Sequence, residues 1–456
     1  MAPRIVIIGG GSNQWVPTLV TDIANTPTLH GTELVLEDID TTKLPRMADY
    51  VRHVADVCGI PLTVSTTTDQ RAALDGADYV VVTISTGGFR SMRHDLDIPA
   101  RYGIQQSVGD TVGPGGINRC LRNVPVIVGI ARDMAELCPD AWLLNLTNPM
   151  TTLCRAVTRE TPIKTIGLCH EVTIATFYLS MLLSASFMAI RPTVVGVNHL
   201  PVITALDVDG EDGLAKLGEI LDSPAAQAEA LPFNLPEELG HEPKQGREWT
   251  KADLIEVNQL KLELFRLTGA LPGAGDRHVA EFFPDFLTEA SGWGKRWGVS
   301  LTPIAAREAD EAKYVERLER LIGEPDVSTW PSGEIVAPLI DSLITGTARL
   351  FPLNIPNAGQ VPDLPDGRVV ESMCWADGQG VRGGEPAYAP PLLASYLQRV
   401  SESQELSVDA ALSGRRDDVV AAMLADPLAS RVDYDQLMSM TDELITATKE
   451  WLPQFA

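Results

Sequence analysis

The feature near the N-terminus that most constrains the fold is an apolar run ending in consecutive glycines. Arg4-Ile5-Val6-Ile7-Ile8 is typical of a strand buried on both faces of a parallel sheet. Gly9-Gly10-Gly11-Ser12-Asn13-Gln14 follows, and a helix-like stretch continues to about Ala24. This order matches the start of a dinucleotide-binding unit, although Gln14 replaces the third glycine of G-x-G-x-x-G. We predict that Gly9, Gly11, Ser12 and Asn13 bind a nicotinamide cofactor; the alternative is a glycine turn in a fold without one.

An acidic pair follows the second predicted strand. Glu33 to Leu36 is apolar in its centre and ends at Glu37-Asp38. A carboxylate at this place accepts hydrogen bonds from ribose hydroxyls and disfavours a 2'-phosphate. Asp38 is therefore predicted to bind the cofactor, and NAD is favoured over NADP.

Strands and helices alternate through the first 200 residues, which predicts an α/β fold with a doubly wound, Rossmann-type parallel sheet. Beyond His199 long polar helical stretches alternate with loops rich in proline and glycine, which predicts a mixed α+β C-terminal lobe. We expect an NAD-binding domain over residues 1–198 and a domain for substrate, metal and oligomerisation over 199–456. Further strands are expected at 77–84, 141–145 and 164–168, and helices at 44–58, 121–137, 254–267 and 306–322.

Composition excludes several classes of partner. The formal net charge of -25 over 456 residues disfavours nucleic acid and anionic membranes, because both require clustered Lys and Arg. No apolar run approaches the roughly 20 residues that span a bilayer. The N-terminus leads directly into a core strand, so we expect a cytoplasmic protein. The six cysteines show no C-x-x-C spacing and are read mostly as core thiols.

Polar residues follow three segments of the predicted fold: Asn148-Pro149, Cys169-His170-Glu171 and Asn198-His199. Ligands bind such sheets where the carboxyl ends of strands gather. A thiolate and an imidazole can together hold a divalent metal, so Cys169 and His199 are candidate ligands. Their separation in sequence is not diagnostic, and a buried thiol with a core histidine is the competing interpretation.

A set of short motifs, taken together, resembles glycoside hydrolase family 4, the NAD-dependent glycosidases. They occur in the family's order across most of the chain. The motifs are Ile5 to Ser12; Met92-Arg93 with Ile98 to Gly103; Gly109-Asp110-Thr111 with Gly113 to Gly116; Thr147-Asn148-Pro149; Cys169 to Val172; Gly196 to His199; Gly275 to His278 with Glu281 to Pro284; and Asn354 to Pro365.

The resemblance implies hydrolysis by redox-assisted elimination. Carbon 3 of the sugar is oxidised by NAD, the proton on carbon 2 becomes acidic, and a metal stabilises the resulting enediolate. The glycosidic oxygen then leaves carbon 1, water adds, and the hydride returns. This family is an exception to the usual scheme of two carboxylates.

The resemblance also implies roles for individual residues. Cys169 and His199 would bind the metal, Mn2+ or another divalent ion, and Asn148 would contact both sugar and nicotinamide. Asp276 is the candidate base at carbon 2, since no Tyr stands near it as in some branches. Asp110 is the candidate acid, or else a capping aspartate in a glycine-rich loop. The predicted substrate-binding residues are Asn148, Arg93, His170, Glu171, Asn198 and His278.

The pair His170-Glu171 departs from the Asp or Asn that follows the ligand cysteine in members acting on 6-phosphorylated sugars. An unphosphorylated or anionic hexoside is therefore expected, with an α-sulfoquinovoside as first choice and an α-glucoside, α-galactoside or α-glucuronide as alternatives. Arg90, Arg93, His94 and Arg101 could contact an anionic carbon-6 group, or be solvated and paired with Asp95 and Asp97.

Two further function classes and one further surface remain open. An ordinary malate- or lactate-type dehydrogenase would share the cofactor unit, and so would a non-enzymatic NAD-binding module. Trp293, Lys295, Arg296 and Trp297 form either an anion-and-sugar surface or a surface loop with half-buried aromatics. The family resemblance implies a homodimer or homotetramer.

Overall fold

The computed structural model describes residues 2–232, 248–323 and 332–455. Its main feature is a nine-stranded sheet in the order β13-β12-β11-β6-β5-β4-β1-β2-β3. The six strands from β6 to β3 in that order are all parallel to their neighbours, which is the Rossmann arrangement and confirms the predicted fold class. They are β1 (Arg4–Ile8), β2 (Glu33–Glu37), β3 (Thr63–Thr67), β4 (Tyr79–Val82), β5 (Trp142–Asn145) and β6 (Lys164–Leu168).

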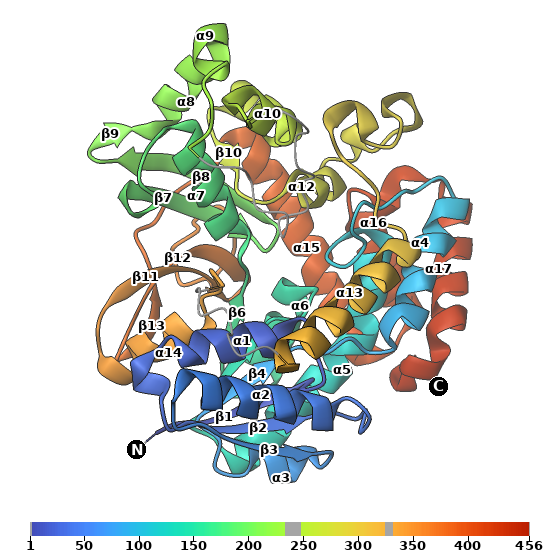
Figure 1. Cartoon of the computed structure of the whole chain (residues 1–456). Coiled ribbons are helices and arrows are strands. Elements are labelled where there is room, and N and C mark those ends of the chain that lie inside the picture. The colour runs from blue at the N-terminus through green and yellow to red at the C-terminus, as the bar shows by residue number, and fades with distance from the viewer. Residues whose placement is uncertain (1, 233–247, 324–331, 456) are drawn as a thin grey trace.

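Helices cover both faces of this sheet (Figure 1). One face packs on α1 (Trp15–Ala24), α2 (Leu44–Cys58) and α14 (Val336–Thr345). The other face packs on a layer of helices with the long α5 at its centre. The helices of this layer are α3 (Gln70–Leu74), α4 (Gly88–Arg101), α5 (Gly113–Leu137), α6 (Met150–Glu160), α15 (Pro391–Ser413), α16 (Arg416–Ala425) and α17 (Tyr434–Thr448).

Late segments of the chain complete the first sheet. β11 (Arg349–Pro356) pairs antiparallel with β6, and β12 (Val369–Asp377) and β13 (Gly380–Gly383) continue outward from it. The predicted division at residue 198 therefore describes the chain only in part, because residues 349–383 and helices α15–α17 pack with the N-terminal unit. Contacts between distant segments place them there, and no local pattern announces such contacts.

A second, smaller sheet lies above the first in Figure 1, with α15 running between the two regions. Its strands are β7 (Ile190–Val197), β8 (Leu200–Val208), β9 (Glu211–Asp212) and β10 (Leu271–Pro272), paired antiparallel. The helices of this lobe are α7 (Glu171–Leu182), α8 (Gly213–Asp222), α9 (Pro224–Gln227), α10 (Lys251–Glu256), α11 (Gln259–Thr268) and α12 (Asp276–Phe282); α13 (Ile304–Gly323) runs back over the first domain. The mixed second lobe matches the predicted one.

The glycine-rich segment Gly113 to Gly116 forms the first turn of α5, although the sequence suggested a loop there. The predicted helix begins at Leu121, whereas α5 begins eight residues earlier at Gly113, with Pro114 in its first turn. A Cβ atom on Gly116 would lie 2.4 Å from the backbone carbon of Thr111, so only glycine allows this close approach.

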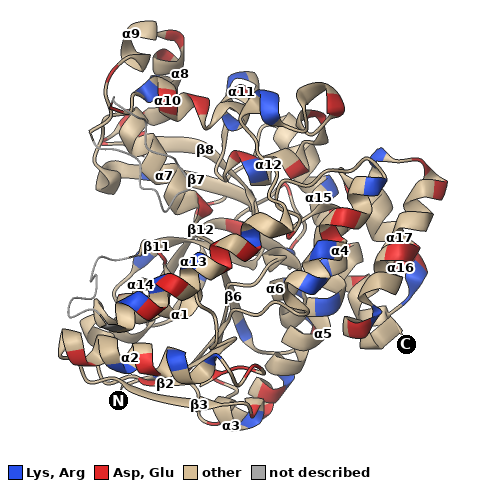
Figure 2. Cartoon of the chain, turned by 45° about the vertical axis from the view of Figure 1, so that its right-hand side comes forward, with Lys and Arg blue, Asp and Glu red and all other residues tan. Residues whose placement is uncertain are grey.

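Within the described residues, no helix combines the length and apolarity that a membrane crossing requires. Figure 2 shows acidic and basic positions interspersed on the helices rather than separated into one basic face.

Candidate active site

The glycine turn after β1 packs against the ends of two neighbouring strands. Gly9 has a φ of 90°, and a Cβ atom there would lie 2.3 Å from the carbonyl oxygen of Thr83. A Cβ on Gly10 would lie 2.7 Å from the Cβ of Leu36. Glycine is therefore required at both places, and the backbone at the N-terminus of α1 keeps the open form that accepts a pyrophosphate.

Asp38 lies directly beside this turn. Its Oδ2 accepts a hydrogen bond from the N–H of Gly11 at 2.9 Å, and its Oδ1 accepts one from Asp40 at 2.8 Å. Next to it, Glu37 is 4% exposed. Burial, with the charges of Asp38 and Asp69, raises the pKa of Glu37 to about 7. The geometry suits the ribose-binding role of Asp38, which stays a prediction.

Two other predicted cofactor residues have protein partners. Ser12 Oγ accepts the N–H of Trp15 at 3.1 Å and so opens the first turn of α1. Asn13 accepts from Arg46 at 2.9 Å and donates to Glu311 of α13 at 2.6 Å. Asn13 therefore ties α13 to the cofactor unit, and a direct contact of either residue with NAD stays a prediction.

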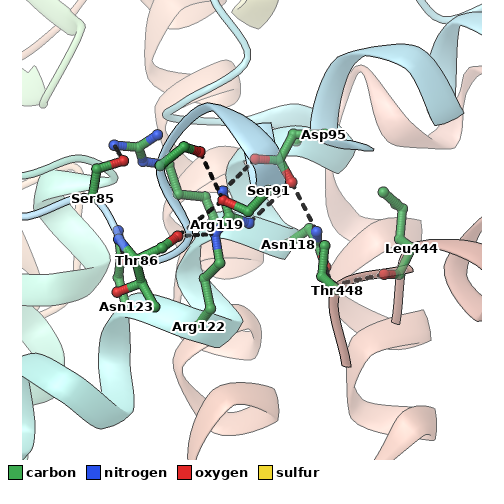
Figure 3. A network of polar contacts seen from close by, with 12 residues as sticks. Ser85, Thr86, Ser91, Asp95, Asn118, Arg119, Arg122, Asn123, Leu444 and Thr448 are labelled. Carbon is green, nitrogen blue, oxygen red and sulfur yellow. Dashed lines mark hydrogen bonds and ion pairs between the residues drawn. The ribbon is translucent and has the colours of Figure 1, made fainter. Parts of the chain in front are cut away.

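Helix α5 supports the loop that follows β4, as Figure 3 shows for Thr86, and also the loop that follows β5. Arg119 Nε and Asn123 Nδ2 both donate to the carbonyl oxygen of Asn148, each at 3.0 Å. Arg122 Nε donates to the carbonyl oxygen of Thr86 at 3.0 Å. Both loops end at the cofactor edge of the sheet, so these contacts fix the position of the predicted sugar-binding residue Asn148.

Three side chains from different elements converge near that edge. The possible ligand atoms of Asp110, His199 and His278 all lie within 4.8 Å of one another. Asp110 precedes α5, His199 lies in the turn between β7 and β8, and His278 belongs to α12. The rings of His199 and His278 have centroids 3.7 Å apart. A carboxylate and two imidazoles form a donor set that divalent transition metals accept.

The backbone and hydrogen bonds at His199 prepare it for such a role. Its φ is 65°, a left-handed conformation that costs a non-glycine residue of order 1–3 kcal/mol and often marks functional sites. Thr111 Oγ1 donates to Asp110 Oδ1 and contacts His199 Nδ1, both at 2.7 Å. Since the single hydroxyl proton goes to Asp110, the threonine oxygen accepts from Nδ1–H, which leaves the lone pair of Nε2 free.

The charge states of the cluster agree with this assignment. Burial, followed by the nearby His278, lowers the pKa of His199 to about 3, so its imidazole is neutral. Burial alone would raise the pKa of Asp110, but His199, His278 and Arg119 outweigh it and hold that pKa well below the usual range. An ionised carboxylate beside neutral imidazoles is the state that binds a cation.

Cys169, the other predicted metal ligand, lies on the Asn198 side of this region. It follows β6 and is 7% exposed. Burial, then the charges of Glu371 and Glu171, raise its pKa well above the ordinary value, while a hydrogen bond with Asn198 opposes the rise. Cys169 is not part of the three-residue cluster found among the described residues. The pairing of Cys169 with His199 therefore stays a prediction.

Several buried polar atoms around the cluster have no hydrogen-bond partner. An unpaired buried polar atom costs about 1–3 kcal/mol, which a ligand rich in hydroxyl groups would offset. Asn198 Nδ2 donates to Glu371 Oε2 at 3.4 Å, yet the other oxygens of both residues stay unpaired. The unpaired atoms in this region are Asn148 Oδ1, Asn198 Oδ1, His278 Nδ1, Glu281 Oε2 and Glu371 Oε1.

Glu171 and His170 border the same region. Glu171 accepts from the N–H of Gly275 and lies 3.9 Å from His278 Nε2. Burial would raise the pKa of Glu171, but three histidines led by His278 lower it to about 2. His170 Nδ1 lies 2.8 Å from Glu334, which outweighs burial and raises the pKa of His170 to about 9. Both predicted substrate residues therefore carry charge beside the cluster.

The carboxylate of Asp276 has a structural use that the sequence did not reveal. It accepts from the N–H groups of Leu260 at 2.8 Å and Lys261 at 3.2 Å, and so caps the N-terminus of α11. The ammonium group of Lys261 lies 3.9 Å away. Asp276 is the neighbour of cluster residues in sequence but not a member of the cluster. The structure thus favours a capping role, and the predicted role as base remains untested.

The arginines of α4 that were predicted to bind an anionic group already form ion pairs with glutamates. Arg93 is half exposed and pairs with Glu308 of α13 at 2.8 Å, where Figure 2 shows basic positions of α4 beside acidic ones of α13. Arg90 and Arg101 pair with Glu450 and Glu443. Asp95, offered as a partner for these arginines, is instead buried with Arg122 of α5. Exposed ion pairs contribute little energy, so the pair with Glu308 does not rule out a contact between Arg93 and the substrate. That contact stays a prediction.

The tryptophan-rich segment is organised as a compact surface loop. Trp297 packs edge-on against Phe286 with centroids 5.1 Å apart, and Arg296 lies over its ring. Lys295 and Arg296 are exposed, and Trp293 is partly buried. These contacts agree with the alternative of a surface loop with half-buried aromatics.

Several residues of this region were not singled out from the sequence. Their common property is a polar group that lies near the cluster or supports it: Thr111, Arg119, Glu281, Arg277, Arg307 and Glu371. Thr111, Arg277 and Glu281 were visible only as parts of the quoted motifs, without a role of their own. Burial raises the pKa of Glu281, and that of Glu371, to about 8 in each case. Isolated Arg or Glu residues carry no local signal of such placement.

Several known proteins are similar to this chain over nearly its whole length. An α-galacturonidase of Bacillus subtilis (strain 168) is 33% identical over 448 residues, covering 96% of each chain. An α-galactosidase of the same organism is 30% identical over 463 residues, covering 99% of each. The crystal structure of a 6-phospho-beta glucosidase from Thermotoga maritima with manganese, NAD+ and glucose-6-phosphate has a TM-score of 0.78 at 22% identity, covering 98% of this chain and 99% of that chain.

The family matches extend over nearly all of the chain. Residues 4–184 match the family described as family 4 glycosyl hydrolase, and residues 194–429 match the family 4 glycosyl hydrolase C-terminal domain. The junction between the two matches lies close to the predicted boundary at residue 198. The chain belongs to the family 4 glycosyl hydrolases, and the protein is a glycosidase.

Proposed function

We propose that this glycosidase depends on NAD and a divalent metal, and cleaves an α-hexoside by transient oxidation at carbon 3, elimination and addition of water. The observation that carries the proposal is the cluster of Asp110, His199 and His278, in which Asp110 accepts a hydrogen bond at 3.4 Å from Asn148 of the loop that follows β5. A dehydrogenase needs the cofactor turn and a general base but no metal, whereas elimination also needs a cation beside the sugar.

The residues present fit both groups. The turn at Gly9 and Gly10 excludes side chains, as a bound pyrophosphate requires. The cluster presents one ionised carboxylate and two neutral imidazoles, a donor set that divalent transition metals, Mn2+ among them, accept. The solved 6-phospho-beta glucosidase with this fold holds NAD+ and manganese. When bound, the nicotinamide exchanges hydride with carbon 3 and the metal polarises the sugar oxygens.

The chain's own groups orient the sugar and control its protons. Asn148, fixed through its carbonyl by Arg119 and Asn123, offers an unpaired Oδ1 to a sugar hydroxyl. Asp110 was expected to act as the acid, but its lowered pKa keeps it ionised near neutral pH. We therefore propose that Asp110 is a cation ligand, with Thr111 fixing both its carboxylate and the tautomer of His199.

The substrate proposed is an α-hexoside with an anionic carbon-6 group, a carboxylate or the sulfonate of an α-sulfoquinovoside. The uronide is supported by the α-galacturonidase relative. The neutral α-galactoside is the runner-up and rests on the α-galactosidase relative. Nitrophenyl α-galacturonide, α-glucuronide, α-sulfoquinovoside and α-galactoside, each assayed with NAD and Mn2+, would rank these choices.

Exchange at carbon 2 tests the mechanism. During turnover in heavy water, the sugar product should gain deuterium at carbon 2, and NAD should be required without accumulation of NADH. Stoichiometric NADH would support a dehydrogenase instead. Product lacking deuterium, once return of the same proton has been excluded, would contradict elimination.

Metal content tests the ligand set. His199→Ala and His278→Ala should each lose Mn2+ by elemental analysis after gel filtration, and Cys169→Ser shows whether the thiol is a further ligand. Arg93→Gln, on the half-exposed α4–α13 contact, is the matched control and should keep the wild-type metal content. Full metal retention in both histidine variants would remove the cluster from the proposal.

A further inference from the structure

Two arginines near the cluster lack a carboxylate partner within the described part of the chain. Arg277 lies on α12 directly before His278, and Arg307 lies on α13. Arg277 Nη2 donates to the carbonyl oxygen of Ser107 at 3.3 Å and also to Thr302. Arg307 Nη2 donates to the carbonyl oxygen of Val108 at 2.6 Å. The two guanidinium groups therefore hold successive carbonyls of the segment that leads into Asp110.

These contacts leave much of both guanidinium groups unused. The Nε atoms of Arg277 and Arg307 are buried without a hydrogen-bond partner. Neither residue forms an ion pair with any described residue, and neither Nη1 has a hydrogen bond there. Two partly buried like charges whose hydrogen bonds go to neutral oxygens are unfavourable until an anion joins them.

The arginines of α4 provide the contrast. Arg90, Arg93 and Arg101 each have a glutamate partner, so an anionic ligand would have to displace an existing ion pair. Among the described residues, no carboxylate competes in this way for Arg277 and Arg307. Guanidinium binds carboxylate and sulfonate through two parallel hydrogen bonds, which gives both affinity and orientation.

We infer that Arg277 and Arg307 form the subsite for the anionic group on carbon 6 of the substrate. This inference rests on the proposed glycosidase function and names the residues that select its substrate class. Arg277 directly precedes His278 of the cluster, and Arg307 donates to the carbonyl oxygen of Val108, two residues before Asp110. The subsite therefore adjoins the cluster. An anion bound there positions the sugar ring over the Asp110, His199 and His278 cluster.

The test compares charged and neutral glycosides on matched variants. Arg277→Gln and Arg307→Gln should each lower kcat/KM for nitrophenyl α-galacturonide or α-sulfoquinovoside by roughly 10- to 100-fold, through a higher KM. The value for the neutral α-galactoside should change less than threefold. Arg71→Gln is the control, since it removes a half-exposed arginine that pairs with Asp133 and Glu136 and belongs to no predicted site, and it should leave kcat/KM for all three substrates unchanged.

The outcomes separate this inference from the proposed function. A wild-type enzyme that cleaves none of the glycosides with NAD and Mn2+ overturns the proposed function. Cleavage of anionic substrates with equal losses on charged and neutral substrates in both variants overturns the subsite alone. Should either glutamine variant fail to fold, Arg307→Lys and Arg277→Lys keep the charge but lose the paired donors. In the wild type, galacturonate should also inhibit cleavage of the α-galactoside at least tenfold more strongly than galactose, and equal inhibition would refute the subsite.

Discussion

The buried ion pair between Asp95 of α4 and Arg122 of α5 offers the most quantitative test of this structure. The two side chains are 0% and 1% exposed, and the guanidinium group binds both carboxylate oxygens. Asn118 also donates to Asp95 at 2.8 Å, and Arg122 donates to the carbonyl of Thr86 (Figure 3). The pair therefore joins two helices to the loop that follows β4.

Asp95→Asn keeps the shape of the side chain and removes its charge. Arg122 is then left as an unpaired charge with no access to water, which costs about 3–5 kcal/mol. The double variant Asp95→Leu/Arg122→Met removes both charges and leaves one amide hydrogen bond of Asn118 unmade, a cost of about 1–3 kcal/mol. The carbonyl of Thr86 keeps a partner because Ser91 Oγ also donates to it. The double variant should thus be more stable than the single one.

Urea unfolding followed by circular dichroism, on cofactor-free protein at fixed pH and concentration, measures both free energies of unfolding. Arg122→Met completes the cycle and gives the coupling energy between the two residues. A single variant that loses less than about 1 kcal/mol, well under the cost of an unpaired buried charge, or a double variant that is less stable than both single variants, would show that the pair is not buried in the way described.

The remaining predictions concern the cofactor edge and the cap of α11. Gly9→Ala should weaken NAD binding more than tenfold by calorimetry, because its φ is 90° and the new methyl group would lie 2.3 Å from the carbonyl of Thr83; unchanged affinity would contradict a cofactor at this turn. The pKa of Glu37 is about 7 in the folded chain against an ordinary 4.5, so folding favours its protonated form. Its contribution to stability is complete below pH 4.5 and is lost as the pH rises through 7, by about 1.4 kcal/mol for each pH unit between those two values. Glu37→Gln should therefore lose less stability than the wild type between about pH 5 and pH 8, as measured by urea midpoints of the cofactor-free protein, and a parallel loss in both would argue against the buried carboxyl. Asp276→Asn should lower the free energy of unfolding by about 2–4 kcal/mol while deuterium exchange at carbon 2 persists, since one of the two capping oxygens and the charge that faces Lys261 are lost; exchange abolished at full stability would support Asp276 as the base.

The N-terminal unit could be predicted because its signals are local. Arg4–Ile8 is a run of apolar residues, and the following glycines satisfy a φ that other residues reach only with strain. The acidic end of β2 follows from the same local pattern. Each of these preferences depends on residues within one turn or strand, so a single sequence contains them.

The cluster was only partly predictable. Its members were all visible as polar residues in separate motifs, yet Asp110 precedes His199 by 89 positions and His278 by 168. Spacing along the chain gives no distance in space, so the sequence did not show that these three side chains meet, while the predicted pair of Cys169 with His199 stays a prediction. The capping role of Asp276 was hidden for the same reason, because its hydrogen-bond partners are backbone groups of another helix.

By itself, the sequence determined the cofactor turn, the parallel half of the sheet and the family to which the chain belongs, because these depend on local periodicity, glycine conformation and motif order. Only the tertiary structure decided that residues 349–383 extend the first sheet, that the arginines of α4 already have acidic partners, and that Arg277 and Arg307 have none among the described residues. Charge pairing and strand pairing are contacts between distant segments, and their energies depend on burial and geometry that exist only after the chain has folded.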